Sequence, residues 1–313
     1  GVGSNIRIDE FKGEIKRILP RENEDINQEW ISDKARFFYD GLTNQRLDKP
    51  YIRKSAKLLA TEWDVAFNSI AKIIKKTNPS DIAAVSGALT DTETMYAAKE
   101  FFKSISVKNI DCRFNLSQIP TNTPSDWLFN SSIASIDKID KLLLIGCDPK
   151  REAPVLNSRI RQRWLTGELD ILTICTPNDL PYKFKSKGND ISLLSSIKFQ
   201  NEIKNFFNKA KYPMVILGDS ILSSKQGSNV HKLTKIICQK SHLIREDWNG
   251  FNILNKYASR VGGLSVNFVP YQGGLSSIEI KKALKSNKIK ILFLIEADDF
   301  KIKVSGKTNE EII

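Results

Sequence analysis

Alternating apolar and polar residues open the chain. Residues 6–19 read IRIDEFKGEIKRIL, with Lys12-Gly13 at the centre. A period of two is typical of a β-strand, and a short turn that contains glycine is typical of a hairpin. We therefore expect two short strands that form a small β unit. Residues 20–53 follow neither the strand period nor the helix period, and we interpret them as an ordered connecting segment.

A helical period begins at residues 62–75. The residues of its apolar face are Trp63, Ala66, Phe67, Ile70, Ile73 and Ile74. Thr61 precedes this stretch and is the expected N-cap, because its hydroxyl can accept a hydrogen bond from a free backbone N–H of the first turn. This helix is expected to open the larger domain.

A short apolar run, a polar turn and an amphipathic helix then follow one another three times. The three pairs of run and helix are residues 82–85 and 91–104, 142–147 and 155–165, and 215–217 and 224–239. Further apolar runs lie at 171–175 and 289–295. Apolar strands that alternate with helices predict an α/β fold with a Rossmann-like, doubly wound parallel sheet. At one helix start, Thr90-Asp91-Thr92-Glu93 has the form of a capping box.

The expected domain organisation follows from these patterns. Residues 1–55 form the small β unit with its connecting segment, and residues 56–313 form the α/β region. The composition agrees with a globular chain, since 41% of the residues are hydrophobic and 27% are charged. The longest apolar runs fall well short of the roughly 20 residues that a bilayer-spanning helix needs. The net charge of +12 is dispersed along the chain without interleaved aromatic residues, which argues against a nucleic-acid partner.

Doubly wound sheets bind ligands at the carboxyl ends of their strands, so the turns there are candidate sites. These turns are Ser86-Gly87-Ala88, residues 146–154 and Gly218-Asp219-Ser220. None has the glycine spacing of a phosphate-binding loop, and Ser86-Gly87 does not form a nucleophile elbow. We expect ordinary turns between strand and helix, although a free anion- or nucleotide-binding module stays an open alternative.

Residue types that carry metal or acid–base chemistry are sparse. The cysteines, which are Cys112, Cys147, Cys175 and Cys238, include no CxxC pair that could close a metal site or a redox disulfide. The only histidines, His231 and His242, are expected on the surface. The acidic residues Glu296, Asp298 and Asp299 are expected to form a solvated loop.

Two arginines on one helix leave a choice of partner. Arg159 and Arg163 stand four residues apart and so share a face of the predicted helix. They could pair with acidic groups of a neighbouring protein, but solvation or pairing within the chain is favoured.

A family resemblance is carried by longer stretches. Residues 1–53, the segment TEWDVAF at 61–67 and the segment LLLIGCDPKREAPVLNSRIRQRW at 142–164 closely resemble the large iron–sulfur subunit, known as the G type, of respiratory complex I. Further matching segments in the same order are NIDCR, PMVILG, DWNGFNIL and ILFLIEADD. The resemblance begins where the molybdopterin-oxidoreductase-like portion of that subunit starts, and it leads us to expect a fragment.

The resemblance implies a supporting role. In that family the cysteines that bind one [2Fe-2S] and two [4Fe-4S] clusters lie upstream of the point that corresponds to Gly1. Some relatives carry a further cluster whose last cysteine stands shortly before an Arg-Phe pair, and here Ser32 holds that place before Arg36-Phe37. We therefore expect no cofactor in this fragment, and a scaffold that supports electron transfer from NADH to quinone. The implied partners are other peripheral-arm subunits, with membrane association only through the complex, on the cytoplasmic side in bacteria or the matrix side in mitochondria.

The same resemblance extends to molybdopterin-dependent oxidoreductases of the formate dehydrogenase kind, which is the alternative function. Those enzymes commonly supply a cysteine or selenocysteine to the metal after a strand that ends like Asn109-Ile110-Asp111. Here Cys112-Arg113 follows, and no cysteine follows the arginine. We expect a vestigial pterin cleft and no catalytic, cofactor-binding or metal-binding residues.

An interface with neighbouring subunits would favour aromatic and arginine side chains. The candidates are Trp30, Arg36, Phe37, Phe38, Tyr39 and Arg46. The same aromatic residues could instead belong to the core of the fold, and the sequence does not decide between the two.

Overall fold

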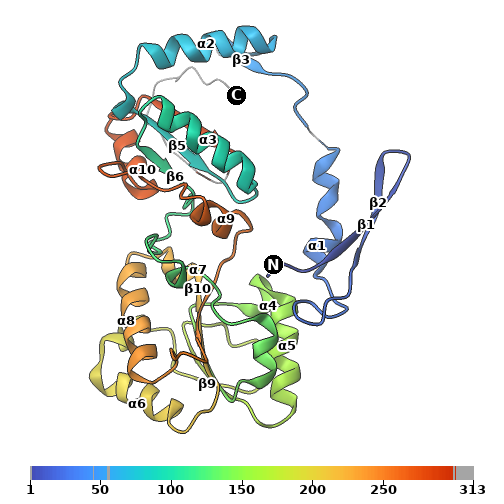
Figure 1. Cartoon of the computed structure of the whole chain (residues 1–313), viewed down its shortest axis with the longest axis vertical. Coiled ribbons are helices and arrows are strands. Elements are labelled where there is room, and N and C mark those ends of the chain that lie inside the picture. The colour runs from blue at the N-terminus through green and yellow to red at the C-terminus, as the bar shows by residue number, and fades with distance from the viewer. Residues whose placement is uncertain (1, 45, 55–56, 299, 301–313) are drawn as a thin grey trace. The chain divides into compact units, whose positions relative to one another are not determined.

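The computed structural model describes residues 2–44, 46–54, 57–298 and 300 (Figure 1). The chain divides into two compact units, each built from two stretches of sequence. Unit 1 comprises Gly1–Tyr39 and Ser117–Val261, and unit 2 comprises Asp40–Leu116 and Gly262–Ile313. The linear division expected from the sequence, into residues 1–55 and 56–313, differs from this one. It stays a prediction about folding units, although its boundary falls between two strands that pair with each other.

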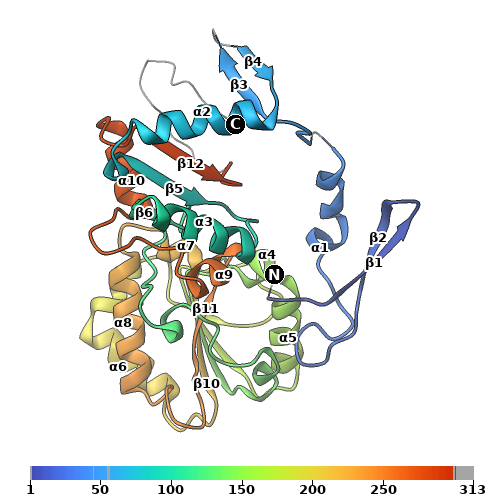
Figure 2. The same cartoon turned by 45° about the horizontal axis from the view of Figure 1, so that its top comes forward.

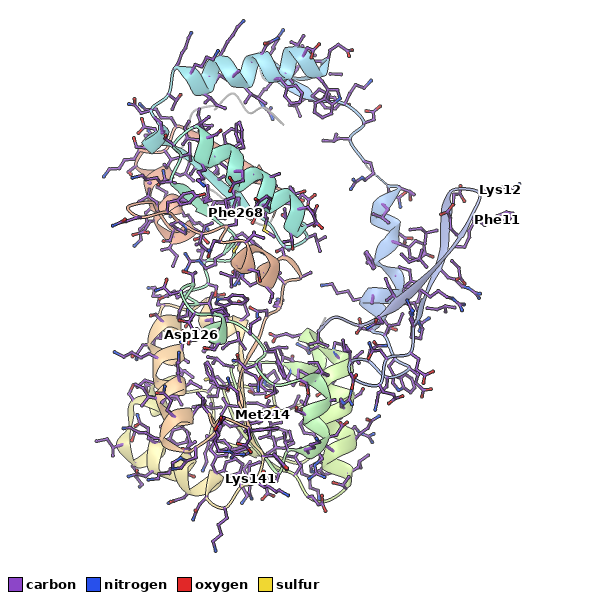
Figure 3. The ribbon with its side chains drawn as sticks, viewed as in Figure 1. Phe11, Lys12, Asp126, Lys141, Met214 and Phe268 are labelled. Carbon is purple, nitrogen blue, oxygen red and sulfur yellow. The ribbon has the colours of Figure 1, made fainter. Side chains whose placement is uncertain are left out.

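The N-terminal hairpin is present in unit 1. Strand β1 (Ile6–Phe11) pairs antiparallel with β2 (Glu14–Pro20), with a register shift between Asp9 and Glu10. Lys12 and Gly13 both have positive φ, 54° and 78°, as a tight hairpin turn requires. In Figure 3 the turn carries Phe11 and Lys12 at its tip, where the Lys12 ammonium lies 5.4 Å from the centre of the Phe11 ring.

The segment after the hairpin contains a helix that the pattern did not predict. Helix α1 (Asp33–Phe37) is followed by a 3₁₀ turn, η1 (Phe38–Leu42). Ser32 caps α1, because its Oγ accepts a hydrogen bond from the Ala35 N–H at 3.2 Å. The helix has only five residues, which is too short for a hydrophobic period to be recognised.

A five-stranded parallel sheet forms the centre of unit 1. Its strands are β7 (Lys141–Ile145), β8 (Asp170–Ile174), β9 (Lys185–Ser186), β10 (Pro213–Gly218) and β11 (Phe251–Leu254). They lie in the order β11-β10-β7-β8-β9. Every residue of β10 is buried, as expected for a strand covered on both faces. The doubly wound parallel sheet predicted from the apolar runs is therefore confirmed.

Helices connect these strands and enclose the core. They are α4 (Pro149–Glu152), α5 (Pro154–Leu165), α6 (Ile197–Phe207), α7 (Asp219–Leu222) and α8 (Gly227–Lys240). Short 3₁₀ turns complete the unit: η3 (Pro124–Asp126), η4 (Ile133–Lys138) and η5 (Ile191–Ser195). The core includes Leu142, Leu144, Ile160, Met214 and Ile216, all fully shielded from solvent. Helix α9 (Ser259–Ser265) follows β11 in the sequence.

Unit 2 has its own parallel sheet of three strands. Strand β5 (Ile82–Ser86) lies between β12 (Ile291–Ile295) and β6 (Asn109–Asp111). Helix α3 (Thr92–Ser104) connects β5 to β6, and α10 (Ser277–Lys285) directly precedes β12 in the sequence. Two elements precede β5, namely a hairpin of β3 (Tyr51–Lys54) and β4 (Lys57–Ala60), and helix α2 (Trp63–Lys75), which leads into η2 (Pro79–Asp81). Figure 2 shows α2 and this sheet from a second direction.

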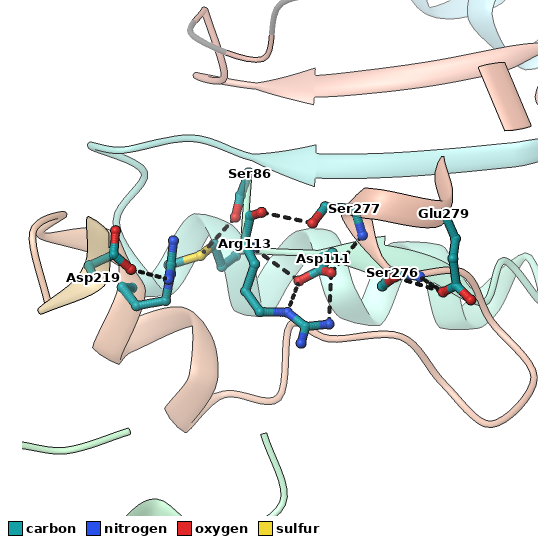
Figure 4. A network of polar contacts seen from close by, with 9 residues as sticks. Ser86, Asp111, Arg113, Asp219, Ser276, Ser277 and Glu279 are labelled. Atoms are coloured by element: carbon teal, nitrogen blue, oxygen red, sulfur yellow. Dashed lines mark hydrogen bonds and ion pairs between the residues drawn. The ribbon is translucent and has the colours of Figure 1, made fainter. Parts of the chain in front are cut away.

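Both predicted helix caps were misplaced by one residue. Helix α2 is capped at Glu62, without a side-chain hydrogen bond, so the expectation for Thr61 was wrong. Asp91, not Thr90, caps α3, and its carboxylate accepts from the Thr94 N–H at 2.6 Å. Carboxylates are strong caps at a helix N-terminus, where they also meet the positive end of the helix dipole. A complete capping box forms at Ser276 and Glu279, at the start of α10 (Figure 4).

Within the described residues, no helix has the length and apolar character needed to cross a bilayer.

Candidate functional site

The order of the five-stranded sheet reverses between β7 and β10, the position where doubly wound folds bind ligands. Two of the candidate turns lie there, residues 146–154 after β7 and Gly218-Asp219-Ser220 after β10. The two turns contact each other directly, because the Ser220 hydroxyl donates a hydrogen bond to the Gly146 carbonyl. The buried Cys147 Sγ lies 3.8 Å from the Ile216 carbonyl. The chain's own atoms thus join the two strand ends.

The glycines in these turns serve that close packing. A Cβ added to Gly218 would lie 2.2 Å from the Gly146 carbonyl oxygen, and one added to Gly146 would lie 2.5 Å from the Ile221 Cβ. Gly146 also has a φ of 55°, a conformation that glycine adopts without strain. The space that a phosphate cradle would leave open for a ligand is therefore filled by neighbouring residues.

Acidic and basic side chains both lie at this strand end. Asp148, Glu152 and Asp219 lie close enough for Asp148 and Asp219 to affect the Glu152 titration. Burial raises the pKa of Glu152 to about 7, more than the nearby Lys256 ammonium lowers it. Glu152 Oε2 is buried and has no hydrogen-bond partner among the described residues. Asp219 pairs with the buried Arg260 guanidinium at 3.2 Å. Sequence reasoning did not single out Glu152, because one acidic residue in a turn gives no signal of burial.

Thiols and imidazoles do not assemble into a metal site. No group of three or more His, Cys, Asp or Glu side chains with suitable geometry occurs in the described part of the chain. Burial raises the pKa of Cys147 well above its ordinary value, and it also raises the pKa of Cys238 and Cys175. A metal binds the thiolate form, so these raised values disfavour ligation.

One of the two histidines contradicts its prediction. His231 is buried, with its Nε2 2.8 Å from the Asp126 carbonyl oxygen, and burial lowers its pKa. Because helix α8 contains several lysines, the sequence suggested an exposed helix. Its inward face, which carries His231, Thr234 and Cys238, was therefore not recognised. His242 is exposed, as expected.

In unit 2, the segment where a molybdenum enzyme would place its metal ligand is a structural hydrogen-bond network (Figure 4). Asp111 is fully buried and pairs with Arg113 through contacts of 2.8 and 2.9 Å. It also accepts a hydrogen bond from the Ser277 N–H at 2.8 Å, which fixes the start of α10. Cys112 follows β6 directly and is buried, with its N–H donating to the Phe268 carbonyl at 2.9 Å.

The remaining turn, Ser86-Gly87-Ala88, also packs closely within unit 2. A Cβ on Gly87 would lie 1.7 Å from the Glu296 carbonyl oxygen. Glu296 and Asp298 are exposed, as a solvated loop requires, and Asp299 lies outside the described residues.

Taken as donors for molybdopterin, the residues at these strand ends do not fit. That cofactor is anionic and needs a cradle of backbone N–H groups, but the turns of unit 1 leave none, because neighbouring residues fill the space beside Gly146 and Gly218. In unit 2 the carboxylate of Asp111 is engaged by Arg113 and Ser277.

The arginines of α5 pair within the chain, as favoured. Arg159 is buried and binds both Asp137 carboxylate oxygens, at 2.8 and 2.7 Å. It also lies 3.4 Å from the Ile26 carbonyl, which fastens the segment after the hairpin to the α/β core of unit 1. Arg163 binds Glu168 at 2.7 Å and the Ile139 carbonyl at 2.7 Å. This fastening role was not foreseen, because Ile26 and Arg159 are 133 positions apart.

The aromatic residues after the hairpin are exposed. Trp30, Phe37 and Phe38 are 54%, 63% and 53% exposed, so the hypothesis that they belong to the core was wrong. Arg36 and Tyr39 are half-buried and hold α1 and η1 against β2, through bonds to the carbonyls of Ile18 and Lys16 at 3.4 and 3.3 Å. We call Trp30, Phe37 and Phe38 the aromatic surface. Arg46, the last interface candidate, is exposed and lies in unit 2.

Comparison with known proteins supports the resemblance drawn from the sequence. The G subunit of the NADH-quinone oxidoreductase of Rickettsia bellii is 41% identical over 292 residues, covering 92% of this chain and 42% of the relative. Its counterpart in Rickettsia prowazekii is 40% identical over 297 residues, covering 95% of this chain and 42% of the relative. The chain thus spans about two fifths of the length of these relatives. The resemblance to the G-type iron–sulfur subunit is confirmed.

Family models match both ends of the chain. Residues 1–40 match the model described as NADH-ubiquinone oxidoreductase NDSU1/NuoG-like, 4Fe-4S domain, although no cysteine occurs before Cys112. A chain in a solved formyltransferase/hydrolase complex from Methylorubrum extorquens is 13% identical, with a TM-score of 0.47, over 69% of this chain and 64% of that chain. Residues 46–312 match the model described as molybdopterin oxidoreductase. Since this last match covers most of the sequence, the chain belongs to the molybdopterin oxidoreductase family.

Proposed function

We propose that residues 1–313 form a scaffold portion of the iron–sulfur subunit of an NADH-quinone oxidoreductase, the respiratory complex I. The portion carries no electrons itself and supports transfer from NADH to quinone through [2Fe-2S] and [4Fe-4S] clusters bound elsewhere in the subunit. The observation that carries this proposal is the identity of about 40% to the G subunits of the Rickettsia enzymes, over alignments that cover 92% and 95% of this chain. Both family models match parts of the same chain.

The thiol chemistry supports the absence of a redox centre in this part. Cys112, Cys147 and Cys238 are buried. Cys112, Cys147 and Cys175 follow three different strands, β6, β7 and β8, and Cys238 lies in α8. Ser32, at the position where some relatives have a cluster cysteine, is instead the cap of α1. A serine hydroxyl engaged in capping serves the helix and is a poor replacement for a thiolate ligand.

The aromatic surface supports a role in assembly. Three large aromatic side chains that are more than half exposed lie within residues 30–38. Burying each against a partner would contribute roughly 1–2 kcal/mol, at about 25 cal/mol per Å² of apolar area. The partners we propose are other peripheral-arm subunits. The chain would then reach the membrane only through the complex, on the cytoplasmic side in bacteria or the matrix side in mitochondria.

Cysteine replacement in the full-length protein tests the proposal. Each of the four cysteines is changed to alanine, and the assembled complex is examined by electron paramagnetic resonance and for NADH-quinone activity. We expect every iron–sulfur signal to survive each change. Loss of one cluster signal in any variant, with assembly intact, would refute the scaffold role.

Metal analysis of the same complex addresses the alternative, a molybdopterin-dependent oxidoreductase of the formate dehydrogenase kind. Molybdenum or tungsten bound in proportion to the protein would favour that enzyme over the scaffold.

A further inference from the structure

A cavity of about 690 Å³ lies in unit 1, at the end of the five-stranded sheet where its strands begin. Lys141 opens β7, Asp170 opens β8 and Lys185 opens β9, and all three line the cavity. In Figure 3, Lys141 marks this end of the sheet. The volume falls within the roughly 300–1,000 Å³ of small-molecule sites. Doubly wound folds bind their usual ligands at the opposite end, where the strands finish, so the cavity is separate from the turns considered above.

Aromatic side chains form much of the apolar part of the cavity. Trp164 comes from the last turn of α5, Phe184 precedes β9, and Phe206 comes from the last turn of α6. Each of them is half-buried, and Trp164 and Phe184 pack against the core of the unit. Aromatic rings that are held by a core in this way offer a rigid surface on which another flat ring can stack.

Lysines supply most of the charge at the cavity. Three of them line it, against one acidic residue, Asp170. Lys141 is already engaged, because it pairs with Asp170 and its ammonium lies 5.5 Å from the centre of the Phe206 ring. Lys183 and Lys185 are exposed and form no ion pair with the described residues. Two such ammonium groups beside an apolar surface favour a ligand that carries negative charge.

Two helices end beside the cavity, and the carbonyl groups at a helix C-terminus carry partial negative charge. The Gly167 N–H donates to the Trp164 carbonyl at 3.0 Å. The Asn208 N–H donates to the Asn205 carbonyl at 3.1 Å, so the chain itself engages carbonyls at both helix ends. Asn205 and Asn208 also line the cavity, and an asparagine amide can both donate to and accept from the edge of a polar ring.

We propose that this cavity binds a nucleotide, with the base against the aromatic side chains and the phosphate groups beside Lys183 and Lys185. A nucleotide joins the two chemistries that line the cavity, because a base has a flat face with polar edges and a phosphate is an anion. The concave shape favours a small molecule over the surface of a partner subunit. This inference adds a ligand site to unit 1 and stands independently of the proposed function.

Calorimetric titration of the full-length protein tests the proposal. The probes are adenosine diphosphate, adenosine, which lacks the phosphate groups, and pyrophosphate, which lacks the base. We expect the diphosphate to bind at least tenfold more tightly than either part, because only the whole nucleotide uses both the aromatic and the lysine side chains. The double substitution Lys183→Glu/Lys185→Glu should weaken its binding at least tenfold. The matched control is Lys225→Glu/Lys232→Glu, which makes the same charge change at exposed lysines outside the cavity and should leave binding unchanged.

Three results would overturn the proposal. One is no binding at up to about 1 mM adenosine diphosphate, which would favour a partner subunit as the occupant. The second is pyrophosphate binding as tight as that of the nucleotide, because the site would then recognise charge alone. The third is an equal loss of binding in the control variant.

Photolabelling of the unaltered protein with an azido derivative of adenosine diphosphate provides a second measurement if the lysine variant does not fold. Labelled peptides that contain Trp164, Phe184 or Phe206 are expected. Label confined to other parts of the protein would contradict the assigned cavity.

Discussion

Glu152 gives the clearest link between the structure and a solution measurement. Its folded pKa of about 7 lies above its ordinary value of 4.5, because the carboxyl is buried and Oε2 has no hydrogen-bond partner among the described residues. The ionised form is therefore disfavoured in the folded protein. A group with a raised folded pKa contributes stability below its unfolded pKa, and that contribution is lost as the pH rises through the folded pKa.

The magnitude follows from the size of the shift. A shift of about 2.5 pH units corresponds to roughly 3.4 kcal/mol at 1.36 kcal/mol per unit. Because the Glu152 side chain is partly exposed, solvent screening reduces this to about 1–2 kcal/mol. Replacing Glu152 by Gln removes the ionisation. The substitution should be nearly neutral at pH 5, and it should raise the free energy of unfolding by about 1–2 kcal/mol at pH 8.

Urea unfolding at pH 5, 6, 7 and 8, followed by tryptophan fluorescence, measures the difference between Glu152→Gln and the unaltered protein. Glu246→Gln is the control, because Glu246 is an exposed residue of the same unit. The difference for Glu152→Gln should grow between pH 5 and pH 8, and the difference for the control should stay constant. A difference for Glu152→Gln that does not change with pH would refute the reasoning.

Three further substitutions test other parts of the structure. Phe37→Asp on the aromatic surface should weaken binding to the proposed partners, the peripheral-arm subunits, at least tenfold in a pull-down titration, and unchanged binding would refute the proposed interface. Gly218→Ala should lower the free energy of unfolding by about 1–3 kcal/mol, because the new Cβ would lie 2.2 Å from the Gly146 carbonyl oxygen. The control is Gly41→Ala, which has open space around the new Cβ and should change the free energy of unfolding by less than about 0.5 kcal/mol. Asp137→Asn should lower the free energy of unfolding by about 1–2 kcal/mol, because it weakens the ion pair of the buried Arg159 with a carboxylate that is itself 47% exposed. Limited proteolysis near Ile26 should become faster, and a variant as stable as the unaltered protein would contradict the fastening role.

Local pattern predicted most of the elements in the α/β region. The apolar runs became β5, β7, β8, β10 and β12 because parallel strands need apolar residues on both faces. The sequence could not show that these strands form two separate sheets. Strand β12 pairs with β5 across more than 200 positions, and no local period encodes such a pairing.

The candidate sites were harder to predict because burial depends on distant segments. His231 faces inward because residues near Asp126 pack over it, more than 100 positions earlier in the chain. In contrast, the N-cap of α1 did have a local signal, since Ser32-Asp33 is a favourable helix start. The exposure of Trp30, Phe37 and Phe38 could not be read from their residue types, since aromatic residues are common in cores and in interfaces alike.

The central claim is that residues 1–313 hold no redox centre, and metal content tests it most directly. The full-length protein and a variant lacking all four cysteines of this region are purified anaerobically, and iron, molybdenum and tungsten are measured by mass spectrometry. The claim predicts the same iron content in both proteins and no molybdenum or tungsten in either. A lower iron content in the folded variant, or molybdenum or tungsten in proportion to the protein, would contradict it.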